Sequence, residues 1–136
     1  MPSPFIFTDT SAWYALADTS DAHHHAASQF VDALSIPLVT STYILDETVT
    51  LLRMHMGHSV ACHFGEKLRL EQIARLIRIT EQDEQRAWEI FVRYHDKEFS
   101  FTDCTSFALM ERLQIDTAFA FDTHFLQYGK FVVMPS

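Results

Sequence analysis

Three short apolar runs in this chain each end on an aspartate. The runs and the acids that follow them are Phe5–Thr8 with Asp9, Phe99–Thr102 with Asp103, and Ala118–Phe121 with Asp122. A fourth acid, Glu47, lies in the helix-like stretch 42–56. Carboxylates at the carboxyl ends of parallel strands gather in one crevice. Several close carboxylates repel one another unless a cation joins them, and Mg²⁺ or Mn²⁺ prefers oxygen ligands. The four acids therefore predict a metal-dependent phosphodiesterase.

The rest of the pattern predicts one α/β domain over residues 1–136 that would bring these acids together. Short apolar runs indicate five strands, at residues 5–8, 36–40, 74–79, 118–121 and 131–134. Helical spacing or capping indicates helices that begin at Ser11 and span 21–34, 42–56, 60–70, 81–95, about 103–113 and 123–127. Alternating strands and helices predict a short, mostly parallel central sheet with helices on both faces.

The predicted helix 42–56 carries the least expected acid. Ser41 or Thr42 is a plausible N-cap, and Gly57 closes the helix. Glu47 borders an expected apolar stripe, so its carboxylate must be paired, exposed or bound to a cation. The stripe consists of Leu45, Val49, Leu52 and Met56.

Each of the other acids has an ordinary structural explanation as well. Asp9 suits a helix N-cap, Asp103 suits the same role beside Thr102, and Asp122 suits a turn. A cap and a metal ligand are compatible, because a helix N-terminus stabilises negative charge. The joint placement of the acids, more than any one of them, favours function.

Composition limits the other possibilities. The net charge of −8 argues against indiscriminate binding to nucleic acid. Residues 53–78 nevertheless carry a net charge of +3, which leaves −11 for the remainder of the chain. This contrast suits the binding of a polyanion, whose backbone the basic segment would hold beside the acidic centre. No apolar run approaches the roughly 18 residues that span a bilayer, so we expect a cytoplasmic protein.

Several reactive residue types receive a plain interpretation. Cys62 and Cys104 are expected to be buried or idle, and the three consecutive histidines from His23 to form a solvated helix start. Contact between His124 and a substrate phosphate is a minor alternative. Trp88 is expected in the core, while surface charges are expected at Asp46, Asp83, Glu84 and Glu111.

Four segments together resemble the PIN-domain ribonucleases, and in particular the VapC toxins of prokaryotic toxin–antitoxin pairs. These segments are Thr8–Ser11, Leu45–Thr48, Ser100–Cys104 and Phe121–Phe125. The resemblance implies that Mg²⁺ or Mn²⁺ is bound by Asp9, Glu47, Asp103 and Asp122, with lesser polar roles for Ser11 and Thr102. It also implies an RNA substrate, a cognate antitoxin and a homodimer.

One departure and three rival functions remain. Many relatives have a further acid shortly after the fourth, whereas residues 123–125 contain none, so the resemblance leaves one or two metal ions open. A phosphatase with a D-x-D nucleophile is disfavoured because Ser11 replaces the second aspartate. A phosphoacceptor domain is disfavoured because the last strand lacks a lysine. A PIN-like binding module without activity stays open.

Overall fold

The computed structural model describes residues 4–136 and has a single parallel sheet at its centre. The sheet order is β3-β2-β1-β4-β5, and all four neighbouring pairs are parallel. The strands are β1 (Ile6–Thr8), β2 (Leu38–Ser41), β3 (Arg75–Ile77), β4 (Thr117–Phe119) and β5 (Val132–Met134). The predicted α/β class and parallel sheet are confirmed.

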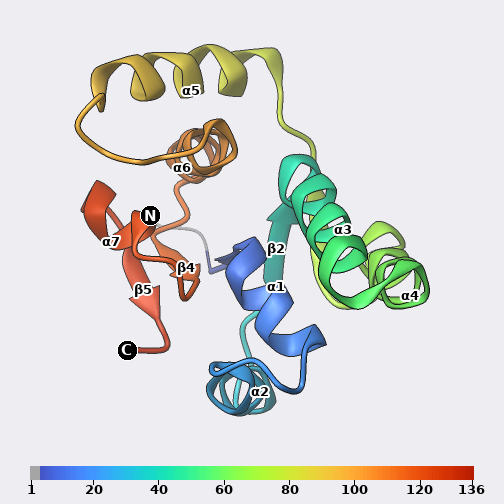
Figure 1. Cartoon of the computed structure of the whole chain (residues 1–136). Coiled ribbons are helices and arrows are strands. Elements are labelled where there is room, and N and C mark those ends of the chain that lie inside the picture. The colour runs from blue at the N-terminus through green and yellow to red at the C-terminus, as the bar shows by residue number, and fades with distance from the viewer. Residues whose placement is uncertain (1–3) are drawn as a thin grey trace.

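Seven helices connect these strands and cover the sheet (Figure 1). They are α1 (Thr10–Ala17), α2 (His24–Asp32), α3 (Thr42–Met56), α4 (His58–Arg69), α5 (Glu81–Arg93), α6 (Phe101–Leu113) and α7 (His124–Tyr128). Right-handed crossovers place α1 to α4 on one face and α5 to α7 on the other. Figure 1 accordingly shows α3 and α4 across the strands from α7. Within residues 4–136, no helix is long and apolar enough to cross a membrane.

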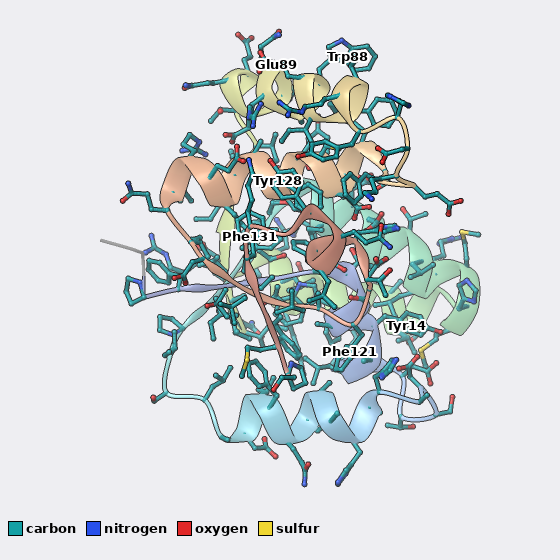
Figure 2. All side chains as sticks on the ribbon, turned by 90° about the vertical axis from the view of Figure 1, so that its left-hand side faces the viewer. Tyr14, Trp88, Glu89, Phe121, Tyr128 and Phe131 are labelled. Atoms are coloured by element: carbon teal, nitrogen blue, oxygen red, sulfur yellow. The ribbon has the colours of Figure 1, made fainter. Side chains whose placement is uncertain are left out.

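Aromatic side chains fill much of the core. Trp13 is 1% exposed, and its indole nitrogen donates to the Thr40 hydroxyl at 3.1 Å, so α1 is fastened to β2. On the other face Phe107 stacks on Tyr128 at 4.3 Å between ring centroids, which joins α6 to α7. Tyr128 and Phe131 are labelled near the middle of Figure 2.

The helix caps refine the predicted boundaries. Ser41 caps α3 by accepting from the Ile44 amide, and Gly57 ends this helix with a φ of 95°, as predicted. The buried side of α3 consists of Ile44, Thr48 and Leu52, which is displaced by about one residue from the predicted stripe. Of the predicted stripe only Leu52 is fully buried, and its other three residues are half-buried.

Two predictions about α5 are wrong. Trp88 is 55% exposed, since α5 packs on α6 and leaves its outer side uncovered (Figure 2). Asp83, expected on the surface, is 1% exposed and accepts from Arg112 at 2.7 and 2.9 Å. Burial alone raises the pKa of Asp83, but hydrogen bonds from Arg112 and Thr80 and the arginine charge lower it overall. This bidentate pair joins α5 to α6.

We expect Arg112→Met to lower the free energy of unfolding by about 2 kcal/mol at pH 7, because Asp83 would stay buried without its cation. The folded-state pKa of Asp83 lies below its ordinary value of 3.8, so the contribution of the pair is present above that pH and is lost as pH falls below it. Urea unfolding at pH 7 and pH 3 measures both effects. The matched control is Arg69→Met, whose exposed pair with Glu66 should contribute less than about 0.5 kcal/mol. Equal losses in the two variants would contradict the assignment.

Candidate active site

The four acids singled out in the sequence meet in one pocket of about 310 Å³. They come from four separate segments: the end of β1, the middle of α3, the first turn of α6 and the loop after β4. The lining consists of Asp9, Thr10, Ser11, Glu47, Leu51, Ser100, Asp103, Asp122 and His124. The structure places Thr102 outside this lining, with its carbonyl accepting from the Thr105 and Ser106 hydroxyls.

Asp9 is held where β1 passes into α1. Its amide donates to the Phe119 carbonyl at 3.0 Å, which ties it to the neighbouring strand β4. Its carboxylate caps α1 by accepting from the Ser11 amide at 3.2 Å and the Ser11 hydroxyl at 2.7 Å. The side chain is therefore fixed at the sheet edge and almost fully buried. Asp9 is thus both the cap of α1 and part of the acidic pocket.

Ser11 also anchors the loop that carries Asp122. Its hydroxyl oxygen accepts from the Phe121 amide at 2.9 Å and from the Asp122 amide at 3.3 Å. The strand β4 ends at Phe119, so residues 120 and 121, predicted to continue it, lie outside the strand, and the Phe121 amide bonds to Ser11 of α1. One hydroxyl thus sets the spacing between the segments of Asp9 and Asp122.

Asp103 lies in the first turn of α6, close to where the sequence predicted a helix to begin. Ser100, and not Thr102 or Asp103, is the N-cap of α6. Its hydroxyl accepts from the Asp103 amide at 3.0 Å, while the Asp103 carboxylate accepts from the Ser100 amide at 2.9 Å. This capping box orients Asp103 and places it where a helix N-terminus favours negative charge.

His124 is a pocket residue whose contacts the sequence reasoning missed. Its Nδ1 lies 2.6 Å from Asp103 and 3.1 Å from Asp122, so one imidazole bridges two of the acids. The His124 amide also donates to Asp122 at 2.8 Å. The available signal was the Asp-x-His spacing, because an aspartate side chain in a turn commonly accepts from the amide two residues later.

The pocket makes negative charge costly. Burial, together with the charges of Asp103 and Glu47, raises the pKa of Asp9 to about 7, although hydrogen bonds from Ser11 partly offset this. Burial and neighbouring carboxylates likewise raise the pKa of Glu47 and of Asp103. A cation that joined these oxygens would reverse the direction of these shifts.

The donor set fits a hard divalent cation in its chemistry. All four acids offer carboxylate oxygens, which Mg²⁺ and Mn²⁺ prefer, and Ser11 offers a hydroxyl. Within residues 4–136, however, no three His, Cys, Asp or Glu side chains are already closed around a point that an ion would occupy. Asp9 is turned toward Ser11, and Asp103 toward Ser100 and His124, so a cation in this pocket would have to displace these partners.

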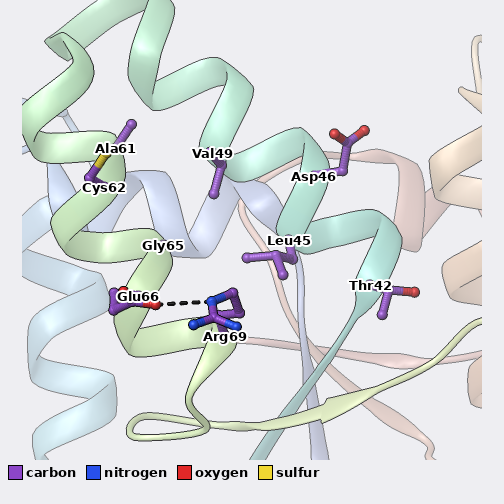
Figure 3. Close-up of a pocket in the computed structure, with 9 residues that line it drawn as sticks. All are labelled: Thr42, Leu45, Asp46, Val49, Ala61, Cys62, Gly65, Glu66 and Arg69. Atoms are coloured by element: carbon purple, nitrogen blue, oxygen red, sulfur yellow. Dashed lines mark hydrogen bonds and ion pairs between the residues drawn. The ribbon is translucent and has the colours of Figure 1, made fainter.

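A larger cavity of about 500 Å³ lies between α3 and α4 (Figure 3). Its charged residues are Asp46, Glu66 and Arg69, and Glu66 is paired with Arg69 at 2.9 Å. The exposed thiol of Cys62 also lines it, whereas Cys104 is buried, with its pKa raised to about 12 by burial and by Asp103. Because no cluster of acids converges there, the smaller pocket carries the candidate chemistry.

Comparison with known proteins gives consistent matches. Residues 6–131 match the PIN domain family. The chain is 39% identical over 130 residues to the 23S rRNA-specific endonuclease VapC20 of Mycobacterium tuberculosis, covering 96% of this chain and 98% of that protein. The crystal structure of that VapC20, described as a sarcin–ricin loop cleaving toxin, superposes with a TM-score of 0.89 at 38% identity over 96% and 99% of the two chains. A toxin–antitoxin complex from Klebsiella pneumoniae shares the fold, with a TM-score of 0.62 at 14% identity over 87% of each chain.

The raised pKa of Asp9 gives a stability prediction for protein without divalent cations. Between about pH 4 and pH 7 the folded protein keeps a proton on Asp9 that the unfolded chain has lost, so this group lowers stability as pH rises through that interval. We expect Asp9→Asn to raise the free energy of unfolding by on the order of 2 kcal/mol at pH 8 and by little near pH 4. Asparagine also caps helices well, so α1 should be preserved.

Thermal unfolding in a chelator at both pH values measures this effect. Asp46→Asn, an exposed aspartate on α3, makes the same change of charge outside the pocket and should shift both melting temperatures by little. An Asp9→Asn protein that is no more stable than the parent at pH 8 would contradict the charge strain assigned to this carboxyl.

Proposed function

The chain belongs to the PIN domain family, and from this premise we propose that it is an endoribonuclease that hydrolyses RNA phosphodiester bonds with the help of Mg²⁺ or Mn²⁺. The observation that carries the proposal is the convergence of four carboxylates from distant segments in one pocket. The residues proposed to hold the cation are Asp9, Glu47, Asp103 and Asp122. A bound divalent cation supplies charge that stabilises the phosphoryl oxygens and acidifies the attacking water.

The side chains of the pocket would divide the remaining work. Asp9 and Asp103 are the more buried acids, each oriented by a helix cap, and so suit fixed positions toward the cation. Asp122 is 37% exposed in its side chain, which suits acceptance of a proton from the attacking water. His124 is a positioning residue that keeps Asp103 and Asp122 at a set spacing.

The proposed substrate class rests on the relatives of this chain. Because a relative 39% identical over nearly its full length is named for cleaving 23S rRNA, we infer that a structured loop of large-subunit ribosomal RNA is the substrate of this chain too. RNA loops present unpaired nucleotides, which proteins recognise more readily than they recognise bases within a duplex.

Partner proteins form a further part of the proposal. The acidic pocket would attract an arginine of a cognate antitoxin, because a guanidinium pairs bidentately with carboxylates. The shared fold with a chain of a toxin–antitoxin complex supports such a partner. A homodimer, expected from the same resemblance, belongs to this proposal as well.

Glu47→Gln tests the enzymatic role most directly. It removes one negative charge from the pocket with little change in shape, so we expect cleavage of a ribosomal RNA hairpin to fall by at least roughly 100-fold in kcat/KM. Asp46→Asn, the adjacent residue on the same helix, faces the other cavity and should stay within about threefold of the parent. A Glu47→Gln preparation that cuts as fast as the parent would count decisively against the proposal.

A thermal titration separates an intact site from a PIN-like binding module that has lost activity. A ligand bound only by the folded state raises stability by mass action, so millimolar Mn²⁺ should raise the melting temperature of the parent by several degrees. Glu47→Gln should show a clearly smaller shift, and Asp46→Asn the full shift. Identical responses in all three proteins would place Mn²⁺ binding elsewhere.

A further inference from the structure

We propose that the stacked rings of His23 and Phe121 form a platform for an unpaired base of the RNA, next to the phosphate that is cut. The inference rests on the proposed nuclease function and adds to it the group that positions a nucleotide. The two rings are nearly parallel, with 4.5 Å between centroids and 12° between planes. They come from different segments, the N-cap of α2 and the loop after β4.

The lower ring of the platform is rigidly supported. Phe121 is half-buried and meets Phe119 edge-on at 6.0 Å between centroids. Phe119 is fully buried and packs in turn on Phe30 of α2 at 4.7 Å. His23 covers Phe121 and is itself exposed, so the outer face of its ring is open to a further flat partner.

The platform is also fixed relative to the acids. Phe121 immediately precedes Asp122, and its amide donates to the same Ser11 hydroxyl that donates to Asp9. Figure 2 shows Phe121 toward the end of the molecule that also carries Tyr14 of α1, well below Trp88 of α5. Phe121 and Asp122 are consecutive, so their Cα atoms lie about 3.8 Å apart and the platform adjoins the segment that carries this acid.

The local charge favours stacking over attraction of phosphate. Asp18 and Asp21 lie on the same connection as His23, and Asp21 accepts from the His23 amide at 2.9 Å. With an acidic pocket on the other side, this surface offers a nucleic acid little electrostatic attraction along its backbone. A base has a π-face whatever its identity, and stacking on aromatic or histidine rings is a common means of holding unpaired RNA.

The experiment uses a synthetic RNA hairpin with the sarcin–ricin loop sequence, with 2-aminopurine placed on either side of the mapped cut. We expect His23→Ala to raise KM roughly tenfold while kcat changes by less than about twofold, because one stacked base is lost and the acids are untouched. His23→Phe keeps a flat ring and should stay near the parent. His25→Ala, an exposed histidine two residues further along α2, is the matched control and should leave KM unchanged.

Binding is measured separately in the Asp9→Asn background with Mg²⁺. Quenching of 2-aminopurine fluorescence should persist in this background and in its His23→Phe variant, and should be lost in its His23→Ala variant. Unchanged KM and quenching in His23→Ala would overturn the platform, as would an equal loss in His23→Phe, which would indicate a polar contact. If the parent protein cuts no RNA, the proposed function fails, whereas a parent that cuts equally well with and without the ring at position 23 defeats only this inference.

Discussion

The main constraint on this structure is the negative charge of four carboxylates in one partly buried pocket. Carboxylates at close range repel one another, and burial strengthens that repulsion. The pKa of Asp9, raised to about 7, shows how strongly the pocket opposes its ionisation. The surrounding protein supplies hydrogen-bond partners for these acids. The Ser11 amide and hydroxyl donate to Asp9, the Ser100 amide donates to Asp103, and the His124 imidazole contacts Asp103. The helices and loops near the site are arranged to supply these groups.

Sheet topology determines where the charge gathers. From β1 the chain moves outward through β2 to β3, then crosses back to β4 on the other side of β1. The strand order therefore reverses between β1 and β4, which is where ligands of open α/β sheets bind. Asp9 and Asp122 follow these two central strands, while α3 and α6 add one acid each from opposite faces of the sheet.

Much of this arrangement could be read from the sequence, because the signals were local and strong. Short apolar runs ending in an acid predicted β1 and β4 and the convergence of Asp9 with Asp122. Glu47 stood out because its predicted helix was otherwise apolar on that side. These patterns reflect burial and helical or strand spacing, which neighbouring residues largely determine.

The failures came where a contact between distant segments decided the outcome. Asp83 was predicted on the surface, yet Arg112, 29 residues later, makes its burial possible. Trp88 was predicted in the core, yet no element covers the outer side of α5 among the residues described. The Ser100 cap was missed because Thr102 and Asp103 are equally good capping residues by type, and only the backbone geometry selects between them.

The contacts of His124 with Asp103 and Asp122 have a consequence for folding and for cation binding. An imidazole, a hydroxyl and a backbone amide already contact the carboxylates of Asp9, Asp103 and Asp122. Under the proposed function, a divalent cation would therefore enter the pocket by replacing partners that the folded protein already supplies. Folding and loading with the cation would then be separate events.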